Sequence, residues 1–151
     1  MAKAALSFMD IALDEARSAE ARGEVPVGAV VVRNGEIIAR NGNRTRENND
    51  PTAHAEMLVI REAASKLKSE RLSGCDLYVT LEPCAMCAGA ISFARLARLY
   101  FAASDSKGGG VEHGPRFFSQ ATCHHAPDVY SGLSEAESAL ILRDFFKSRR
   151  N

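Results

Sequence analysis

The pattern of apolar and polar positions predicts helices and strands that alternate along most of the chain. Near the start, Leu6, Met9 and Leu13 recur at helical spacing, with Asp14 and Glu15 toward the other side. Near the end, an S-x-x-E capping box of serine and glutamate opens a last helix. The predicted helices cover residues 3–22, 54–67, 84–95 and 134–149.

Four apolar or β-branched runs predict strands. Asn34-Gly35 separates the first two runs, which indicates a hairpin with a type I′ turn. The third run is continuously apolar, as expected for a strand covered on both faces. Strand–helix–strand order then predicts an α/β sheet with right-handed crossovers. The predicted strands cover residues 27–32, 36–40, 77–81 and 99–103, and residues 41–51 and 104–119 are expected to form loops, the second mobile.

Composition favours one compact domain, residues 1–151. Hydrophobic residues make up 46% of the chain and charged residues 25%, which favours neither disorder nor a membrane class. Nineteen basic residues balance nineteen acidic ones, so net charge gives no support for nucleic-acid binding. One basic cluster lies at the end, at Lys147, Arg149 and Arg150, where the dipole of the last helix alone would favour it.

The N-terminal segment does not resemble a signal peptide, because Asp10, Asp14 and Glu15 interrupt its apolar residues. No stretch approaches the roughly 18 apolar residues of a membrane helix. We therefore expect a cytoplasmic protein with no membrane partner. In a reducing compartment a Cys-x-x-Cys pair indicates metal or redox chemistry. The cysteines are Cys75, Cys84, Cys87 and Cys123.

His54 and the pair Cys84 and Cys87 each lie where a predicted helix begins. Helix N-termini converge on the ligand site of an α/β sheet, so the two segments can meet despite the distance between them in sequence. One imidazole and two thiolates are typical zinc ligands, and three protein ligands leave the fourth position to water. Zinc lowers the pKa of that water toward roughly 7.

Glu56 follows His54 by two residues, which on a regular helix puts the two side chains about 200° apart. They can share a site only if His54 precedes the fully helical backbone. In that position Glu56 could take a proton from the attacking water and return it to the base and the leaving amine.

These residues together match H-x-E…P-C-x-x-C, the signature of zinc deaminases, with Pro83 before Cys84. The match extends over residues 24–30, 43–44, 50–56, 77–90 (LYVTLEPCAMCAGA) and 105–107, and over Phe145-Phe146 with Arg149-Arg150. The chain therefore resembles the bacterial tRNA-specific adenosine deaminases of the cytidine deaminase-like superfamily. That resemblance implies a three-layer α/β/α fold with a central mixed sheet of about five strands.

The resemblance also implies a hydrolase that converts adenosine to inosine at the wobble position of a tRNA anticodon. It implies one Zn²⁺ per subunit on His54, Cys84 and Cys87, with Glu56 as the catalytic proton shuttle. A homodimer with the 84–95 helix near its interface is implied as well. The implied contacts with the flipped base are Asn43, Val27 and Leu81, and those with the anticodon stem-loop are Asp105, Lys107, Phe145, Phe146 and Arg149. No motif of the family matches residues 108–123.

Other interpretations of the same residues stay open. Cys75 or Cys123 could complete a closed structural zinc site. The same chemistry could act on a free base or nucleotide, such as guanine or cytosine, or the chain could be a non-catalytic zinc-stabilised RNA-binding module. Asn43 could simply belong to a turn, His124-His125 to the surface, and Phe145-Phe146 to the core.

Overall fold

The computed structural model describes residues 2–149, so Arg150 of the predicted basic cluster lies outside the described residues. The predicted elements are all present, with boundaries that differ by at most two residues. The helices are α1 (Ala2–Ala21), α2 (Ala55–Leu67), α3 (Ala85–Ala94), the short η1 (Phe117–Ser119) and α4 (Glu135–Arg149). The strands are β1 (Gly28–Arg33), β2 (Glu36–Gly42), β3 (Cys75–Leu81), β4 (Arg98–Ala103) and β5 (Asp128–Ser131).

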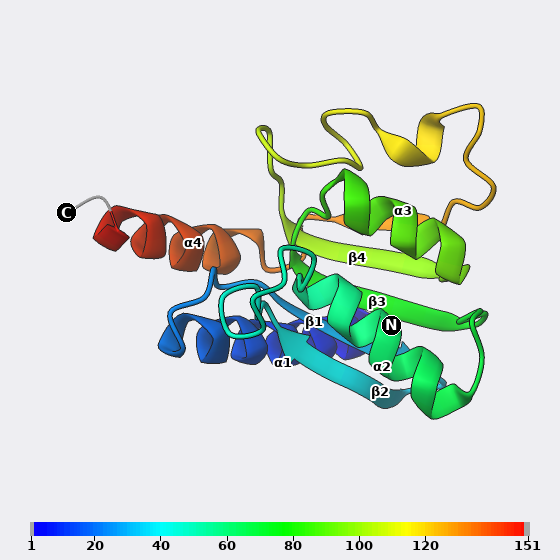
Figure 1. Cartoon of the computed structure of the whole chain (residues 1–151), viewed down its shortest axis with the longest axis horizontal. Coiled ribbons are helices and arrows are strands. Elements are labelled where there is room, and N and C mark those ends of the chain that lie inside the picture. The colour runs from blue at the N-terminus through cyan, green and yellow to red at the C-terminus, as the bar shows by residue number, and fades with distance from the viewer. Residues whose placement is uncertain (1, 150–151) are drawn as a thin grey trace.

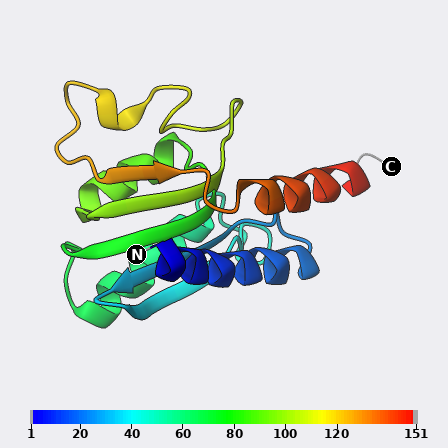
Figure 2. The same ribbon diagram turned by 180° about the vertical axis from the view of Figure 1, so that it is seen from behind.

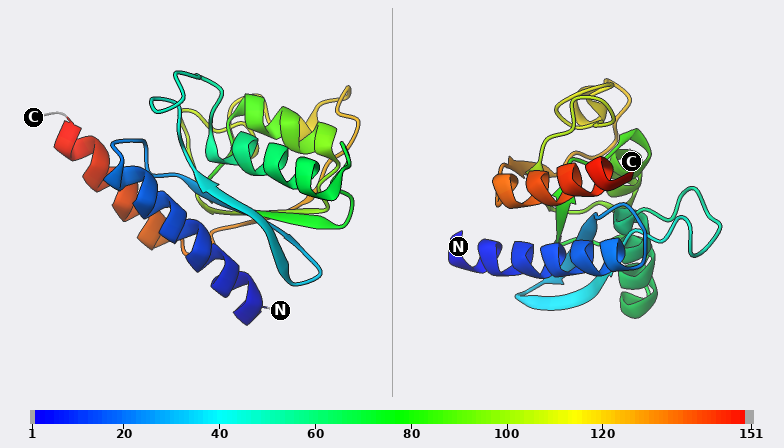
Figure 3. Two further views of the ribbon diagram at one scale, coloured as in Figure 1. Left: turned by 60° about the horizontal axis from the view of Figure 1, so that its bottom comes forward. Right: turned by 90° about the vertical axis from the view of Figure 1, so that its left-hand side faces the viewer.

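The five strands form one mixed sheet in the order β2-β1-β3-β4-β5 (Figure 1). β1 pairs antiparallel with β2 and β3, whereas β3, β4 and β5 run parallel to one another. Helices α2 and α3 cover one face of the sheet, and α1 and α4 lie on the other, as Figures 2 and 3 show. This is the three-layer α/β/α arrangement with five strands expected from the resemblance.

Alternating side chains of the sheet fill two separate cores, because successive strand residues point to opposite faces. Val31, Leu77 and Phe101 are among the residues packed under α2 and α3. Val30 and Tyr78 pack against α1 on the other face. None of the described helices has the length and hydrophobicity needed to cross a bilayer.

Helix α1 lies unusually close to the sheet at Gly28. A Cβ atom there would lie 2.0 Å from the Ala12 carbonyl oxygen and 2.5 Å from the Ala16 nitrogen. Only glycine therefore lets α1 rest on β1 at this point. The Gly28 N–H donates to Thr80 Oγ1 on β3, which ties the start of β1 to the next strand.

The β1–β2 hairpin is confirmed, with positive φ at both Asn34 (51°) and Gly35 (78°), as a type I′ turn requires. The capping box is wrong: Ser134 has φ 58°, not the extended backbone of an N-cap, and the Glu137 carboxylate pairs with Arg17 of α1. Strand β5 was not predicted, because its four residues are mostly exposed and carry no apolar run.

Candidate active site and metal centre

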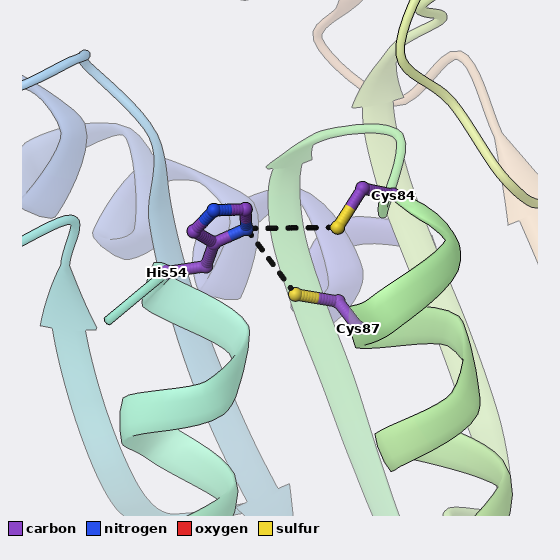
Figure 4. A group of neighbouring side chains, drawn as sticks. All are labelled: His54, Cys84 and Cys87. Atoms are coloured by element: carbon purple, nitrogen blue, oxygen red, sulfur yellow. Dashed lines mark hydrogen bonds between the residues drawn. The ribbon is translucent and has the colours of Figure 1, made fainter. Parts of the chain in front are cut away.

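The N-termini of α2 and α3 point at the same place from neighbouring positions on one face of the sheet (Figure 4). His54 is the N-cap of α2 and Cys84 the N-cap of α3, both with extended backbone (φ −72°, ψ 152° and φ −71°, ψ 174°). Their carbonyl oxygens accept the first helical hydrogen bonds, from Leu58 and Ala88. The helix dipoles therefore put partial positive charge where the donor side chains gather.

His54 Nδ1 lies 3.6 Å from Cys84 Sγ and 3.5 Å from Cys87 Sγ. Zinc–nitrogen and zinc–sulfur bonds of ordinary length, joined at a tetrahedral angle, place nitrogen and sulfur about 3.6 Å apart. The three donors thus have the spacing of ligands around one tetrahedral ion, and their chemistry is that of a zinc site.

Among the described residues, the cluster has three donors and no fourth. Within residues 2–149, His54, Cys84 and Cys87 are the one group of three or more His, Cys, Asp or Glu donors close enough to share an ion. Cys75 is buried at the start of β3, and the Cys123 thiol donates to the His125 carbonyl oxygen. A closed four-ligand zinc site on Cys75 or Cys123 is therefore wrong.

Glu56 occupies the second position of α2 and is only 4% exposed. Its pKa is raised to about 7, chiefly by burial, and Cys84 raises it further. Because the backbone at His54 is extended, the side chains of His54 and Glu56 reach the same site although they are only two residues apart. Glu56 is thus a buried carboxyl group poised to accept or release a proton near neutral pH.

Hydrogen bonding between the two thiols shifts their pKa values in opposite directions. The Cys87 thiol donates to Cys84, which lowers the pKa of Cys84 to about 4 and raises that of Cys87. The hydrogen bond to Cys84 also raises the pKa of His54. A bound cation takes the place of these protons, because sulfur ligates metals as thiolate.

A cavity of about 370 Å³ opens beside the metal centre. Its walls come from the segment before β1, the loops after β2 and β4, the end of β3 with the turn that follows it, the start of α2, and α4. It brings the predicted residues Asn43, Val27, Leu81, Asp105 and Phe146 to the same place. The lining residues are Val25, Val27, Asn43, Thr45, His54, Glu56, Leu81, Glu82, Cys84, Asp105, Gly108 and Phe146.

Asn43 is 8% exposed and held from both sides. Its Oδ1 accepts a 2.7 Å hydrogen bond from the Ala55 N–H, the first of α2, and its carbonyl oxygen accepts one from Arg22. The acceptor end of the amide is thereby used, so Nδ2 is the group left to face a ligand as a donor.

Three of the predicted contact residues do not line the cavity: Lys107, Phe145 and Arg149. Lys107 is exposed at the tip of the loop after β4, and its N–H donates to Asp105 Oδ1. Phe145 is buried, with the Arg149 guanidinium 4.5 Å above its ring. Phe146, the neighbour that does line the cavity, is 45% exposed.

Two buried carboxylates that the sequence did not single out hold the cavity walls. Glu24 accepts from the backbone N–H groups of Arg46 and Glu47, and Glu82 accepts from those of the loop after β4. Burial favours their protonated forms, but in each case these hydrogen bonds outweigh it and lower the pKa. Residues 104–119, expected to be mobile, are therefore pinned near their start by a carboxylate.

Comparison with known proteins places this site in a family. Residues 2–103 match the cytidine and deoxycytidylate deaminase zinc-binding region, which spans both halves of the metal centre. The chain belongs to this deaminase family. The matched region ends with β4, so α4 and the segment from Ser104 onward lie outside it.

Individual relatives show which members of this family the chain resembles. A tRNA-specific adenosine deaminase of Agrobacterium fabrum is 69% identical over 143 residues, which cover 95% of this chain and 94% of that protein. A solved structure from studies of A-to-I editing by tRNA:A34 deaminases at the wobble position is 70% identical, with a TM-score of 0.89 over 90% of this chain and 99% of that chain. A guanine deaminase from Bacillus subtilis is 33% identical, with a TM-score of 0.65 over 96% and 92%. The resemblance to tRNA-specific adenosine deaminases is confirmed.

Proposed function

We propose that this protein hydrolyses adenosine to inosine at the wobble position of a tRNA anticodon, the whole chain acting as one deaminase domain. One observation carries the proposal. A three-donor cluster, with no fourth donor among residues 2–149, lies beside a buried glutamate in an open cavity, in a chain that is 69% identical to a tRNA-specific adenosine deaminase. A hydrolytic site needs exactly that opening for water and base.

We assign one zinc ion per subunit to His54, Cys84 and Cys87, whose spacing fits the ion. When bound, zinc acts as a Lewis acid and makes water nucleophilic at neutral pH. The donor set is also open to iron or cobalt, so zinc rests on ligand type and on the family.

Glu56 moves the protons of the reaction. It accepts a proton from the attacking water and delivers one to the ring nitrogen next to the reacting carbon. It then accepts the second proton, from the hydroxyl group that the water has added to the carbon, and delivers it to the amino group, which leaves as ammonia while the carbon keeps the oxygen as a carbonyl. Its position inside the protein, beside the cavity, keeps these transfers away from bulk water.

Asn43, Val27 and Leu81 hold the base. With Oδ1 engaged by Ala55, Asn43 offers its amide N–H to an acceptor nitrogen of the purine. Val27 and Leu81 give the cavity apolar surface on which the flat base can pack. A flipped base therefore meets one oriented donor and two apolar side chains.

The anticodon stem-loop lies over the rim of the cavity. Bases of a single-stranded loop splay outward at small cost, which makes such a loop a suitable substrate for a recessed site. Phe146 and Asp105 reach the cavity itself, whereas Lys107 and Arg149 lie outside it, and Phe145 supports Arg149 from below. Arg149 and Lys107 supply positive charge for the phosphate backbone.

The active form is proposed to be a cytoplasmic homodimer. Phe93 is 74% exposed and Met86 36% exposed, both on α3, and exposed apolar surface of this kind is typical of protein interfaces. The location follows from the substrate, which is tRNA.

Guanine deamination is the second candidate, favoured by the full-length match to the Bacillus subtilis guanine deaminase. The test is to incubate the zinc-loaded protein with an unmodified anticodon stem-loop carrying adenosine at the wobble position, and separately with guanine. The proposal expects inosine from the first and no xanthine from the second. Stoichiometric enzyme that yields no inosine would refute it.

A further inference from the structure

A single buried carboxylate gathers the loop after β4. Glu82 lies two residues before Cys84 and its side chain is inaccessible to solvent. Its Oε1 accepts from the Asp105 N–H at 3.0 Å and lies 2.7 Å from His113 Nδ1. Its Oε2 accepts from the N–H groups of Val111 (3.1 Å), Glu112 (2.9 Å) and His113 (3.1 Å). Five donors from the segment 105–113 thus converge on one side chain.

The glycines of this segment serve the close approach to that carboxylate. A Cβ atom on Gly109 would lie 2.4 Å from Glu82 Oε2, and one on Gly110 would lie 2.6 Å from the Ala85 nitrogen. The Gly110 N–H also donates to the Pro83 carbonyl oxygen at 2.8 Å. The loop is therefore packed against the start of α3, where Cys84 lies, and its glycines are needed for contact.

The hydrogen bonds that hold this loop continue from the Glu82 carboxylate to the rim of the cavity. Asp105, held by its N–H on Glu82, accepts at Oδ1 from the N–H groups of Lys107 (3.1 Å) and Gly108 (2.9 Å). Asp105 and Gly108 both line the cavity. One chain of hydrogen bonds consequently runs from Glu82 to the residues assigned to the anticodon.

We propose that Glu82 is a positioning residue for substrate: it fixes the segment 105–113 as a wall of the cavity and sets where Asp105 and Lys107 stand relative to the metal centre. The inference rests on the proposed function. Glu56 lies on α2 and His54 is its N-cap, and within the described residues the hydrogen-bond partners of Glu82 all come from the segment 105–113. Loss of the anchor is therefore expected to affect RNA binding more than turnover.

Glu82→Gln tests this with little change in size. The amide keeps one acceptor oxygen but places N–H donors where backbone N–H groups point, so several of the five hydrogen bonds are lost. We expect KM for the stem-loop to rise about tenfold or more, as loss of even one charged hydrogen bond can cause, with kcat within about threefold. Zinc content should not change.

Glu112→Gln is the matched control, because its exposed carboxylate lies in the same loop and contacts only Ser131 among the described side chains. His113→Ala is a milder variant that removes one of the five donors, in case Glu82→Gln does not fold. Its KM should rise about threefold to tenfold, which is the effect expected from the loss of one hydrogen bond.

Hydrogen exchange measured without RNA tests whether Glu82 anchors the loop, independently of the enzymatic activity. In Glu82→Gln, and not in Glu112→Gln, the amides of residues 105 and 111–113 should exchange at least about tenfold faster while those of β1 stay unchanged. Unchanged exchange in this loop, or faster exchange with an unchanged KM, would overturn the inference. If the wild-type protein forms no inosine, the proposed function fails, and the exchange data alone decide whether Glu82 anchors the loop.

Discussion

Glu56 joins three properties that are rarely found on one carboxyl group. It is buried, its pKa is raised to about 7 by that burial, and it borders a cavity next to the cluster of His54, Cys84 and Cys87. A group that titrates near neutral pH can both take and give a proton at working pH, which deamination requires twice.

Replacing Glu56 by glutamine removes this proton transfer and leaves the shape of the site in place. We predict that kcat falls by about 10²- to 10⁴-fold, the usual contribution of a general acid–base group. Zinc content and the circular dichroism spectrum should match those of the wild type. A non-catalytic RNA-binding module would instead show no difference between the two proteins in any assay of turnover.

The cysteines offer a matched pair of substitutions. Cys87→Ala removes a ligand from the cluster, so we predict loss of bound zinc and of activity. Cys123→Ala removes a thiol that bonds only to a backbone carbonyl and Ser92, so zinc and activity should remain. Elemental analysis of both purified variants checks this, and zinc loss from Cys123→Ala would revive the closed four-ligand site.

For single residues, the sequence predicted that His54, Cys84 and Cys87 would lie together and that His54 would precede the helix, and both are seen in the structure. The second prediction was possible because the spacing of His54 and Glu56 is incompatible with one site on a regular helix.

The sequence could not reveal Glu24 or Glu82. Their partners are backbone N–H groups more than twenty residues away, and a backbone group leaves no trace in residue type. The amide orientation of Asn43 likewise depends on Ala55, which any residue with an N–H could replace.

Among the elements, those with a strong periodic pattern were predicted to within a few residues, and those without one were missed. The turn Asn34-Gly35 specified its hairpin through φ angles that few other residues adopt. β5 was not predicted because its pairing with β4 depends on main-chain hydrogen bonds and not on an apolar run. α4 begins without the predicted cap, because Ser134 has a positive φ angle and Glu137 pairs with Arg17 of α1 instead of the backbone.

Helix α4 contributes Phe146 to the cavity, outside the region matched by the family. We predict that Phe146→Ala raises KM for the stem-loop by about tenfold, since stacking of one base is worth about 1–3 kcal/mol. Leu140→Ala is the control, because Leu140 is similarly exposed on the same helix but does not line the cavity. Equal effects of the two substitutions would show that α4 matters only for stability.

For the whole molecule, the sheet order explains why two motifs thirty residues apart form one centre. β2 and β3 both run antiparallel to β1, and β4 runs parallel to β3, so the loops that follow β2, β3 and β4 reach the same edge of the sheet. Periodicity identified the strands but not their neighbours, because each buried strand can pair with any other of similar hydrophobicity. The resemblance to a family supplied the mixed sheet that local patterns left open.

Hydrolysis of the wobble adenosine is assigned to this one cavity. It is tested most directly by mass spectrometry of an anticodon stem-loop incubated with zinc-loaded protein in water enriched in ¹⁸O. The account predicts inosine at the wobble position alone, carrying one ¹⁸O atom from solvent, and no inosine with Glu56→Gln. Unchanged adenosine with the wild-type protein, or inosine formed equally by Glu56→Gln, would contradict it.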